Sequence, residues 1–227
     1  MQKIIAAIAL LVIASLPAQA QNCKNYLLLQ NNKRVEMTVY NRKGKEDGKQ
    51  VWLVSNAKTV GKTTSATLNT DFFNSKGKSI TKSESQIQCN GGALQMSMKL
   101  MMSEAQLRQM DNATAKAKGE FLDYPVNVKE GDNLPDGNMQ IDYTMQGGMA
   151  ASIEITITNR QVGSKESITS PAGTWECFKI TSNQKILSKV AGMGIPIKMD
   201  VTEWYAPGVG VIKTESKFGS TLITAIE

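Results

Sequence analysis

The sequence predicts a mainly β protein, in which long antiparallel strands form an open barrel or a strongly curved sheet with one helix at about residues 103–118. Two observations predict this class. Apolar and polar residues alternate in many segments, which is the pattern of a strand with one buried face. Short turns rich in glycine and asparagine separate these segments at regular intervals, as is typical of antiparallel sheets and barrels.

The first half of the chain contains two predicted hairpins, each with a polar turn between two strand patterns. The strand patterns and turns are residues 35–40, 42–48 and 51–54 for the first hairpin, and 63–73, 74–77 and 79–89 for the second. Gly61-Lys62-Thr63 resembles the end of a phosphate-binding loop. Because β-branched residues follow it and a helix does not, we interpret it as a turn between strands.

The clearest alternation places five apolar side chains on one face of a strand: Leu94, Met96, Met98, Leu100 and Met102. This face fits a plain hydrophobic core. It also fits the wall of an apolar-ligand cavity, because methionine adapts to varied apolar partners. Copper binding by the soft thioethers is a third interpretation. Together with Leu107 and Met110 of the predicted helix, these residues form the candidate apolar cavity face. Later alternating runs predict further strands at 139–145, 153–157, 178–180 and 197–201.

A single helix is predicted after this run. Ser103 and Gln106 fit a capping box, which marks a helix start. Gly119 suits the position just after the helix. A narrow apolar stripe at helical spacing lies between them: Leu107, Met110, Ala113 and Ala117. We expect a helix of about four turns that covers the concave side of the curved sheet.

The N-terminus predicts export. Lys3 precedes an apolar run at residues 4–16, and Ala18-Gln19-Ala20 is a small-x-small cleavage pattern. Residues 1–20 are therefore expected to be a signal peptide, and residues 21–227 a single β-rich domain. The run is too short to cross a bilayer, and no later segment approaches the ~20 apolar residues of a membrane helix.

The three cysteines are Cys23, Cys89 and Cys177. An oxidising compartment favours one disulfide with one thiol left over. We favour the pair Cys23–Cys89, because Cys23 lies in the N-terminal lead and Cys89 precedes a turn signal. Cys177 lies in an apolar strand pattern and is interpreted as a buried thiol. Lipid attachment at Cys23 is disfavoured, because Asn22 stands where a small residue is required.

The composition excludes several classes of function. The chain has no histidine, which excludes histidine-dependent triads and histidine-ligated metal sites. The net charge of +6 is spread along the chain and aromatic residues make up 6%, so no nucleic-acid partner is expected. No pair of carboxylates is positioned by spacing alone, so we expect no catalytic residues and no enzyme activity.

One loop carries oxygen-bearing side chains that suggest calcium: Asp132, Asn133, Asp136 and Asn138. Leu134 and Pro135 interrupt the alternating ligand pattern that such a site needs. We therefore interpret the loop as a turn, and we expect no metal and no other cofactor.

Near the C-terminus, residues 203–213 read E-W-Y-A-P-G-V-G-V-I-K. The strand patterns on both sides predict a hairpin corner and argue against a phosphate loop, which a helix should follow. Pro207 and Gly208 suit the central positions of a type II turn. Gly210 is expected to mark a bulge or a close approach of Trp204.

Residues 124–137, 170–180 and 203–213 together resemble a family of exported bacterial proteins known only as a domain of unknown function. The stretches read Y-P-V-N-V-K-E-G-D-N-L-P-D-G, S-P-A-G-T-W-E-C-F-K-I and E-W-Y-A-P-G-V-G-V-I-K. The resemblance implies a β-rich envelope protein and supplies no catalytic residues. The expected architecture is also similar to that of the lipoprotein carriers of the Gram-negative periplasm, which hold acyl chains against an apolar concave face. We therefore expect export to the periplasm of a Gram-negative bacterium.

These observations favour a non-enzymatic envelope protein that binds an apolar ligand, such as a lipid, or a lipidated partner. The alternative is a structural or protein-interaction module that binds another envelope protein through a sheet face or edge. An exposed apolar patch favours the alternative, and a cavity favours the first hypothesis.

Overall fold

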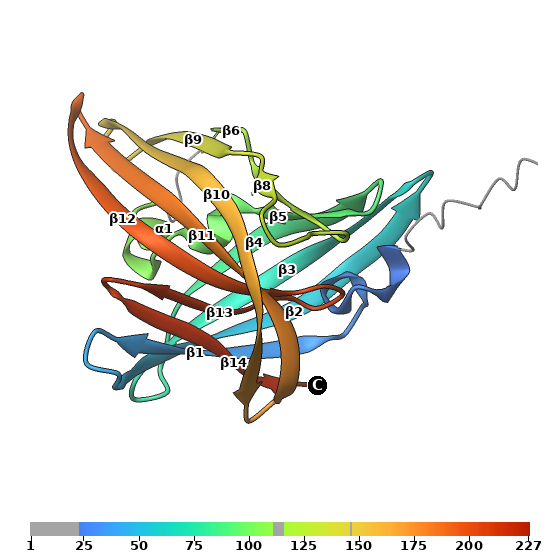
Figure 1. Cartoon of the computed structure of the whole chain (residues 1–227). Helices are drawn as coiled ribbons and strands as arrows, with labels where there is room; N and C mark the ends of the chain where they lie inside the picture. The colour runs from blue at the N-terminus through green and yellow to red at the C-terminus, as the bar shows by residue number, and fades with distance from the viewer. Residues whose placement is uncertain (1–22, 111–115, 146) are drawn as a thin grey trace, which may run out of the picture.

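The computed structural model describes residues 23–110, 116–145 and 147–227 (Figure 1). The expected signal peptide, residues 1–20, lies outside these ranges. The strands are β1 (Arg34–Asn41), β2 (Glu46–Val60), β3 (Thr63–Asn74), β4 (Ser79–Asn90), β5 (Ala93–Ser97), β6 (Lys116–Lys118), β7 (Phe121–Pro125), β8 (Asn133–Leu134), β9 (Gly137–Thr144), β10 (Ala150–Ser170), β11 (Gly173–Val190), β12 (Met193–Ala206), β13 (Gly210–Ser216) and β14 (Gly219–Ile226). The helices are the 3₁₀ turns η1 (Cys23–Asn25), η2 (Leu27–Leu29) and η3 (Met98–Met101) and the α-helix α1 (Glu104–Gln109).

The strands form one antiparallel sheet that bends into a nearly closed barrel with one unsealed seam. Its order is β6-β9-β10-β11-β12-β13-β14-β1-β2-β3-β4-β5-β7, and β8 pairs with β10. The pairing of β14 with β1 brings the last strand beside the first. The predicted mainly β, open-barrel class with one helix is therefore confirmed, as are both hairpins of the first half and the turn at Gly61-Lys62.

The seam lies between β7, at one end of this order, and β6 with β9 at the other. β6 pairs with β9 and β7 pairs with β5, yet only Gly119 and Glu120 separate β6 from β7, so the chain itself crosses the seam there. Glycines permit the close approach of the two sides. A Cβ atom on Gly119 would lie 2.2 Å from the Asn138 carbonyl oxygen, and one on Gly137 would lie 2.6 Å from Leu122 Cδ1.

The N-terminal segment packs against one end of the barrel, at the right in Figure 1. The backbone N–H of Leu27 donates to the Gly208 carbonyl in the β12–β13 turn at 2.9 Å, and Leu28 is buried. A disulfide joins Cys23 to Cys89 at the end of β4, with the Cα atoms 5.6 Å apart. The Cys23 sulfur is thereby bonded to protein and not free for a lipid thioether.

The helix begins where the sequence predicts it. The Ser103 hydroxyl oxygen accepts from the Gln106 N–H at 3.3 Å, and Gln106 Oε1 accepts from the Ser103 N–H at 2.8 Å, which completes the capping box.

The predicted length of the helix is wrong, because α1 ends at Gln109 and residues 116–118 form β6 instead. Two physical reasons account for the difference. Asp111, Asn112 and Thr114 have low helix propensity, since their side chains compete for backbone hydrogen bonds. Pairing with β9 gives the backbone of residues 116–118 alternative hydrogen bonds. Ala113, part of the predicted apolar stripe, lies outside the described residues.

The β12–β13 connection has the predicted turn. The Val209 N–H donates to the Ala206 carbonyl at 3.1 Å, and Gly208 has a φ of +86° at the third position, as a type II turn requires. A bulge follows in the β12–β13 pairing. The close neighbour of Gly210 is Leu28 and not the expected Trp204, because a Cβ on Gly210 would lie 3.3 Å from Leu28 Cδ1.

Replacing Gly208 by valine is expected to lower the free energy of unfolding by about 1–2 kcal/mol, measured by urea denaturation. No atom lies within 4 Å of a Cβ built at this position, so the effect comes from the left-handed backbone alone. Gly208→Asn is the matched control, because asparagine tolerates positive φ and should be less destabilising. A valine variant as stable as the parent protein would contradict the turn assignment.

Candidate functional site

The predicted apolar cavity face lies inside the barrel. Strand β5 ends at Ser97, whose hydroxyl oxygen accepts from the Lys99 N–H and so starts η3; the expected strand is therefore shorter than the alternating run. Five of the seven candidate residues are buried: Leu94, Met96, Met98, Met102 and Leu107. Leu100 and Met110 are half-buried and pack against the same core.

These seven side chains contact other protein side chains. Gly137 illustrates the tight packing, because a Cβ there would lie 3.2 Å from Met98 Sδ and 2.6 Å from Leu122 Cδ1. None of the seven lines either of the two pockets described below. The burial fits the core interpretation and gives the cavity interpretation no support at these positions.

An exposed apolar surface continues this inner face along β12. Alternate residues of β12 from 201 to 205 are buried, but three earlier residues of the same alternation are exposed: Met193 by 78%, Ile195 by 80% and Ile197 by 44%. The cause is the short neighbouring strand, since β13 pairs with β12 only from Val201 onward. In the described part of the chain, residues 193–200 therefore have a strand neighbour, β11, on one side only.

The tip of the adjacent β9–β10 hairpin adds Met149, which is 47% exposed. The Ala191 N–H donates to the Ala150 carbonyl at 3.0 Å and joins the two tips, which project together at the upper left of Figure 1. We call Met149, Met193, Ile195 and Ile197 the hairpin-tip surface. Exposed apolar clusters of this kind mark interaction sites.

A pocket of about 530 Å³ opens beside these tips. Tyr143, Ala151 and Gly192 give it an apolar part, and Lys189 and Asp142 place opposite charges in its lining. Its volume is in the range of small-molecule sites.

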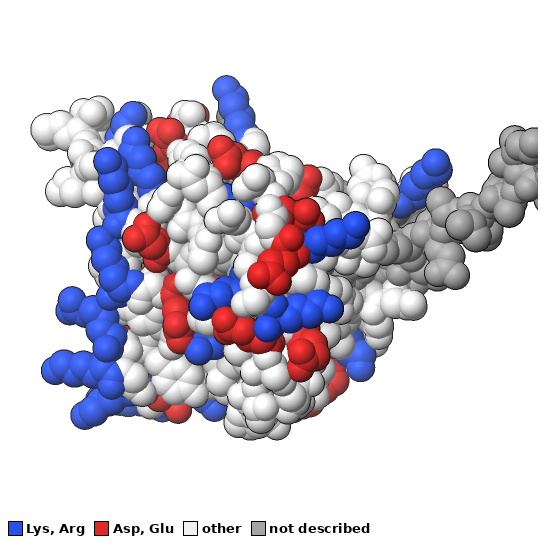
Figure 2. All heavy atoms as spheres, in the orientation of Figure 1, with Lys and Arg blue, Asp and Glu red and all other residues white. Residues whose placement is uncertain are grey.

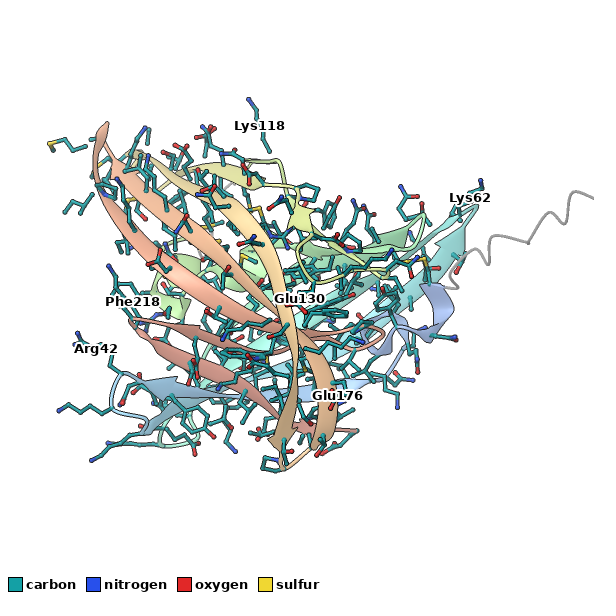
Figure 3. The ribbon with its side chains drawn as sticks, in the orientation of Figure 1. Arg42, Lys62, Lys118, Glu130, Glu176 and Phe218 are labelled. Atoms are coloured by element: carbon teal, nitrogen blue, oxygen red, sulfur yellow. A yellow bond between two sulfur atoms is a disulfide. The ribbon has the colours of Figure 1, made fainter. Side chains whose placement is uncertain are left out.

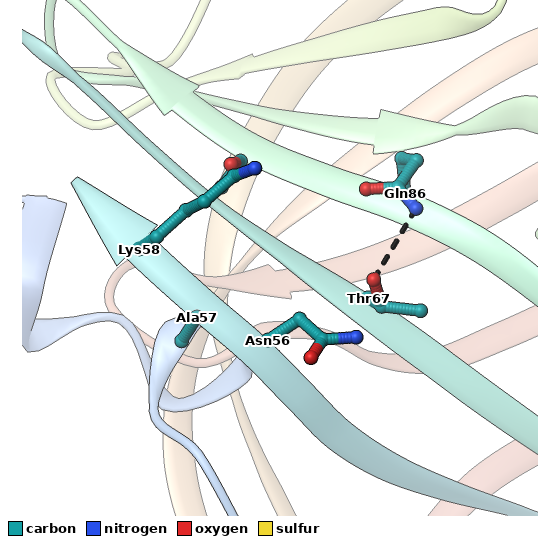
Figure 4. A pocket seen from close by; sticks show the side chains of 6 residues that line it. Asn56, Ala57, Lys58, Thr67 and Gln86 are labelled. Carbon is teal, nitrogen blue, oxygen red and sulfur yellow. Dashed lines mark hydrogen bonds between the residues drawn. The ribbon is translucent and has the colours of Figure 1, made fainter. Parts of the chain in front are cut away.

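A second pocket, of about 460 Å³, lies where β2 bulges at Asn56 (Figure 4). Five of its six lining residues have polar side chains and the sixth is Ala57; Gln86 Nε2 donates to Thr67 Oγ1 at 3.3 Å within this lining. Lys58 is its one charged lining residue. Because no acid, base or nucleophile pair converges there, this pocket does not support a catalytic role.

A buried cluster of charged residues bridges the seam. Arg160 on β10 is 1% exposed and Glu203 on β12 is 4% exposed. Arg160 Nη1 donates to the carbonyl oxygens of Asp123 and Pro135, both at 2.9 Å, and the guanidinium lies 4.9 Å from the centroid of the Tyr124 ring. The Tyr124 hydroxyl donates to the Glu203 carboxylate, 3.1 and 3.0 Å from its two oxygens. The cluster therefore ties β7 to β10 and β12.

Burial is the largest influence on the pKa values of Glu203 and Tyr124 in this cluster. Burial raises the pKa of Glu203, and the positive charge of Arg160 and the Tyr124 hydrogen bond offset part of that effect. Burial and the Glu203 carboxylate together raise the pKa of Tyr124 well above its ordinary value. Neither described pocket includes any of the three residues, so the cluster fits a role in closing the barrel better than a role in chemistry.

Sequence reasoning missed this cluster, although one signal was present. Glu203 continues the inward alternation of the 197–201 run, and a charged residue on a buried face normally has a buried partner. The alternation did not predict a buried Arg160, because a bulge at Asn159 reverses which residues of β10 face inward. At this bulge φ is +54° and the register with β11 shifts. Residues 153, 155 and 157 are buried before the bulge, and Arg160 and Val162 are buried after it.

The resemblance stretches meet around the cluster. Tyr124, from the first stretch, stacks on Tyr205 of the last one with ring centroids 5.2 Å apart, and the Tyr205 hydroxyl lies 3.4 Å from that of Tyr26. Trp204 Nε1 donates to Glu166 Oε2 at 2.7 Å, and the Lys213 Nζ atom lies 4.5 Å from the centroid of the Trp204 ring. These stretches therefore hold β7, β10, β12 and β13 together.

The remaining predicted residues have structural roles. Cys177 is a free, buried thiol, as predicted, and burial raises its pKa to about 11, which disfavours the reactive thiolate. Asp132 Oδ2 accepts from the Lys129 N–H at 2.8 Å, so it forms part of a turn. Within the described ranges, no group of three or more aspartate, glutamate or cysteine side chains could hold a metal ion. No described helix has the length and apolar character needed to span a membrane.

A family model described as DUF3108-like matches residues 30–219. Two crystal structures share the fold at 20% sequence identity. One, from Bacteroides fragilis, is of a protein inferred to be exported and described as having a YmcC-like fold; it has a TM-score of 0.69, with 87% of this chain and 96% of that chain covered. The other is of an inferred lipoprotein from Parabacteroides distasonis, with a TM-score of 0.72 and coverage of 91% and 100%. None of the curated proteins compared with the sequence matches it.

Proposed function

The chain belongs to the DUF3108-like family, and on that premise we propose that it is a non-enzymatic protein of the bacterial envelope that binds an acyl chain, of a lipid or of a lipidated partner, on the hairpin-tip surface. The exposure of Met193 and Ile195, on a strand whose next residues line the core, is the observation that carries the proposal. Export is supported by the descriptions of the two structural relatives as an exported protein and a lipoprotein.

An acyl chain fits this surface for two reasons. The exposed side chains alternate along one face of β12, so they present a narrow apolar strip and not a scatter of single residues. The same alternation is buried from Val201 onward, so the strip is continuous with the apolar core. Covering each large apolar side chain contributes about 1.5–3 kcal/mol.

Native mass spectrometry of the protein purified from the envelope of its own host tests this proposal. We expect a bound mass corresponding either to a lipid or to a lipidated protein, and the mass distinguishes the two sources. The double variant Met193→Asp/Ile195→Asp is expected to lose that mass and to bind a fluorescent fatty acid roughly tenfold or more weakly.

Val60→Asp is the matched control, because Val60 is 72% exposed at the β2–β3 tip, away from the hairpin-tip surface. Parent protein that carries no bound acyl group would contradict the proposal. So would equal loss of fatty-acid binding in the control and the double variant.

The alternative, a protein-interaction module with no small-molecule ligand, is favoured by one observation. Among the described residues, no strand pairs with one edge of β12 at residues 193–200, and a partner strand could be added there. Pro196, which has no N–H to donate, lies within that edge and weakens this mode of binding. A stoichiometric protein without an acyl group in the same mass spectrum would select the alternative.

A further inference from the structure

Two turns of the barrel share the sequence pattern N-x-K-G-K and the same internal hydrogen bonds. The β1–β2 turn, residues 41–45, reads N-R-K-G-K, and the β3–β4 turn, residues 74–78, reads N-S-K-G-K. In the first turn, Asn41 Oδ1 accepts from the N–H groups of Lys43 and Lys45 at 2.9 and 3.3 Å. In the second turn, Asn74 Oδ1 accepts from the two corresponding lysine N–H groups at 3.0 and 3.1 Å. Each turn therefore presents two lysines from a fixed backbone.

The strand register places three basic turns side by side. Gly48 pairs with Asn74, which brings the β3–β4 turn next to the β1–β2 turn. Asn41 pairs with Gly219, which brings the β13–β14 turn to the other side. That third turn contributes Lys217 and Phe218, and the Phe218 side chain is 50% exposed.

The three turns form a surface with an excess of positive charge. We call it the basic-turn face; its exposed basic side chains are Arg42, Lys43, Lys45, Lys76, Lys78 and Lys217. Two exposed acidic side chains, Glu46 and Asp47, follow the first turn. None of the six basic side chains forms an ion pair within the described chain. Lys and Arg side chains project along the left edge of Figure 2, and Figure 3 places Arg42 and Phe218 on that side and Lys62 on the opposite one.

We propose that the basic-turn face docks on an anionic phospholipid bilayer, with the lysines on the head groups and Phe218 in the interface. Charge complementarity argues for this occupant, since basic side chains around an exposed aromatic ring are the composition of interfacial anchors. Nucleic acid is disfavoured, because the basic turns offer one exposed aromatic ring and no series of stacking platforms. The proposal is independent of the hairpin-tip surface, whose residues are not part of this face.

The test is binding of the full chain to vesicles of phosphatidylglycerol and phosphatidylethanolamine, measured by co-sedimentation. We expect binding to these vesicles that is lost on neutral phosphatidylcholine vesicles and at 0.5 M salt, conditions that remove the charge attraction. The variant in which Lys43, Lys45, Lys76 and Lys78 are all replaced by glutamine should bind roughly 30-fold or more weakly. The asparagines and glycines that form the turns are unchanged, and the melting curve checks that the fold is retained.

A matched variant changes four other exposed lysines to glutamine: Lys58, Lys62, Lys118 and Lys129. It has the same net charge and is expected to bind vesicles like the parent protein. An equal loss in both variants would overturn the proposal, because binding would then follow net charge alone. Binding of the parent protein to DNA or to anionic polysaccharide but not to the vesicles would overturn it as well.

A second measurement tests the orientation. Phe218→Cys labelled with a polarity-sensitive fluorophore should brighten on vesicle addition, whereas Val60→Cys, at the distant β2–β3 tip, should not. Labelling is selective because the other three cysteines are in the disulfide or buried. A brightening at residue 60 without one at residue 218 would overturn the proposed face.

Discussion

Replacing Arg160 by methionine is expected to lower the free energy of unfolding by about 3 kcal/mol or more. Methionine has a similar length but cannot donate to the Asp123 and Pro135 carbonyls, and it leaves the Glu203 carboxylate buried without a cation. The cost arises mainly from this uncompensated charge. Urea denaturation, followed by tryptophan fluorescence, measures the effect.

Two further variants make the interpretation specific. Arg42→Met removes an exposed arginine and should change the stability by less than about 0.5 kcal/mol. The double variant Arg160→Met/Glu203→Gln should recover a large part of the loss, because no buried charge then remains without a partner. Additive losses in the double variant would show that the two charges are not coupled and would contradict the bridge across the seam.

The pH dependence of these variants has a defined sign. Burial raises the pKa of Glu203 in the folded protein above its ordinary value of 4.5. As the pH rises from about 4.5 to the folded-state pKa, the unfolded chain has released this proton and the folded chain has not. The unfolded state then binds fewer protons, so the stability falls with rising pH in that window and is flat above it. Removing the Arg160 cation raises the folded-state pKa further, and Arg160→Met is therefore expected to be less destabilising at pH 5 than at pH 8.

The antiparallel barrel could be predicted because its information is local. Each hairpin combines a period of two with a turn whose residues have a defined conformation, such as the positive φ of Gly44 and Gly77. Closure of the sheet could not be predicted in this way. It depends on the register of β14 against β1 and on the crossing at Gly119, which bring together residues far apart in sequence. Local patterns do not contain those registers.

The helix and the methionine run show where periodicity misleads. The apolar positions after Ser103 follow a helical spacing, but residues 116–118 pair with β9 at the edge of the sheet. Likewise, the alternation from 94 to 102 continues past the end of β5, because Met98 and Met102 are buried from a 3₁₀ turn and its C-terminal end. In both cases tertiary packing determined the backbone, and the apolar character showed only that the residues are buried.

The candidate site could be predicted less well than the fold. The apolar inner face was identified, but its exposed part lies at residues 193–197, because β13 is shorter than β12. The alternation within one strand does not show whether that strand extends beyond the strand paired with it. The twin N-x-K-G-K turns could be identified in the sequence, although their adjacency required the pairing of β2 with β3.

Removing the disulfide by Cys23→Ala/Cys89→Ala is expected to lower the free energy of unfolding by about 4 kcal/mol. The two cysteines are separated by 66 residues, so the cross-link strongly restricts the unfolded chain. The loss should begin locally. Without the bond, the N-terminal segment is held by the burial of Tyr26, Leu28 and Leu29 and by a few backbone hydrogen bonds. Amides of residues 26–29 should therefore exchange with solvent faster than those of β3.

Reduction supplies the control for this prediction. Parent protein unfolded in the presence of a reductant should match the double variant, whereas Cys177→Ala should lose only about 1 kcal/mol and respond to reductant like the parent protein. Thiol counting in denaturant should find one free thiol in the oxidised parent protein. Three free thiols would show that the pair does not form, and a double variant as stable as the parent would show that the N-terminal segment holds without it. Either result would mean that packing alone holds η1 and η2 against the barrel. We do not expect this, because each is a 3₁₀ turn of only three residues and has little stability of its own.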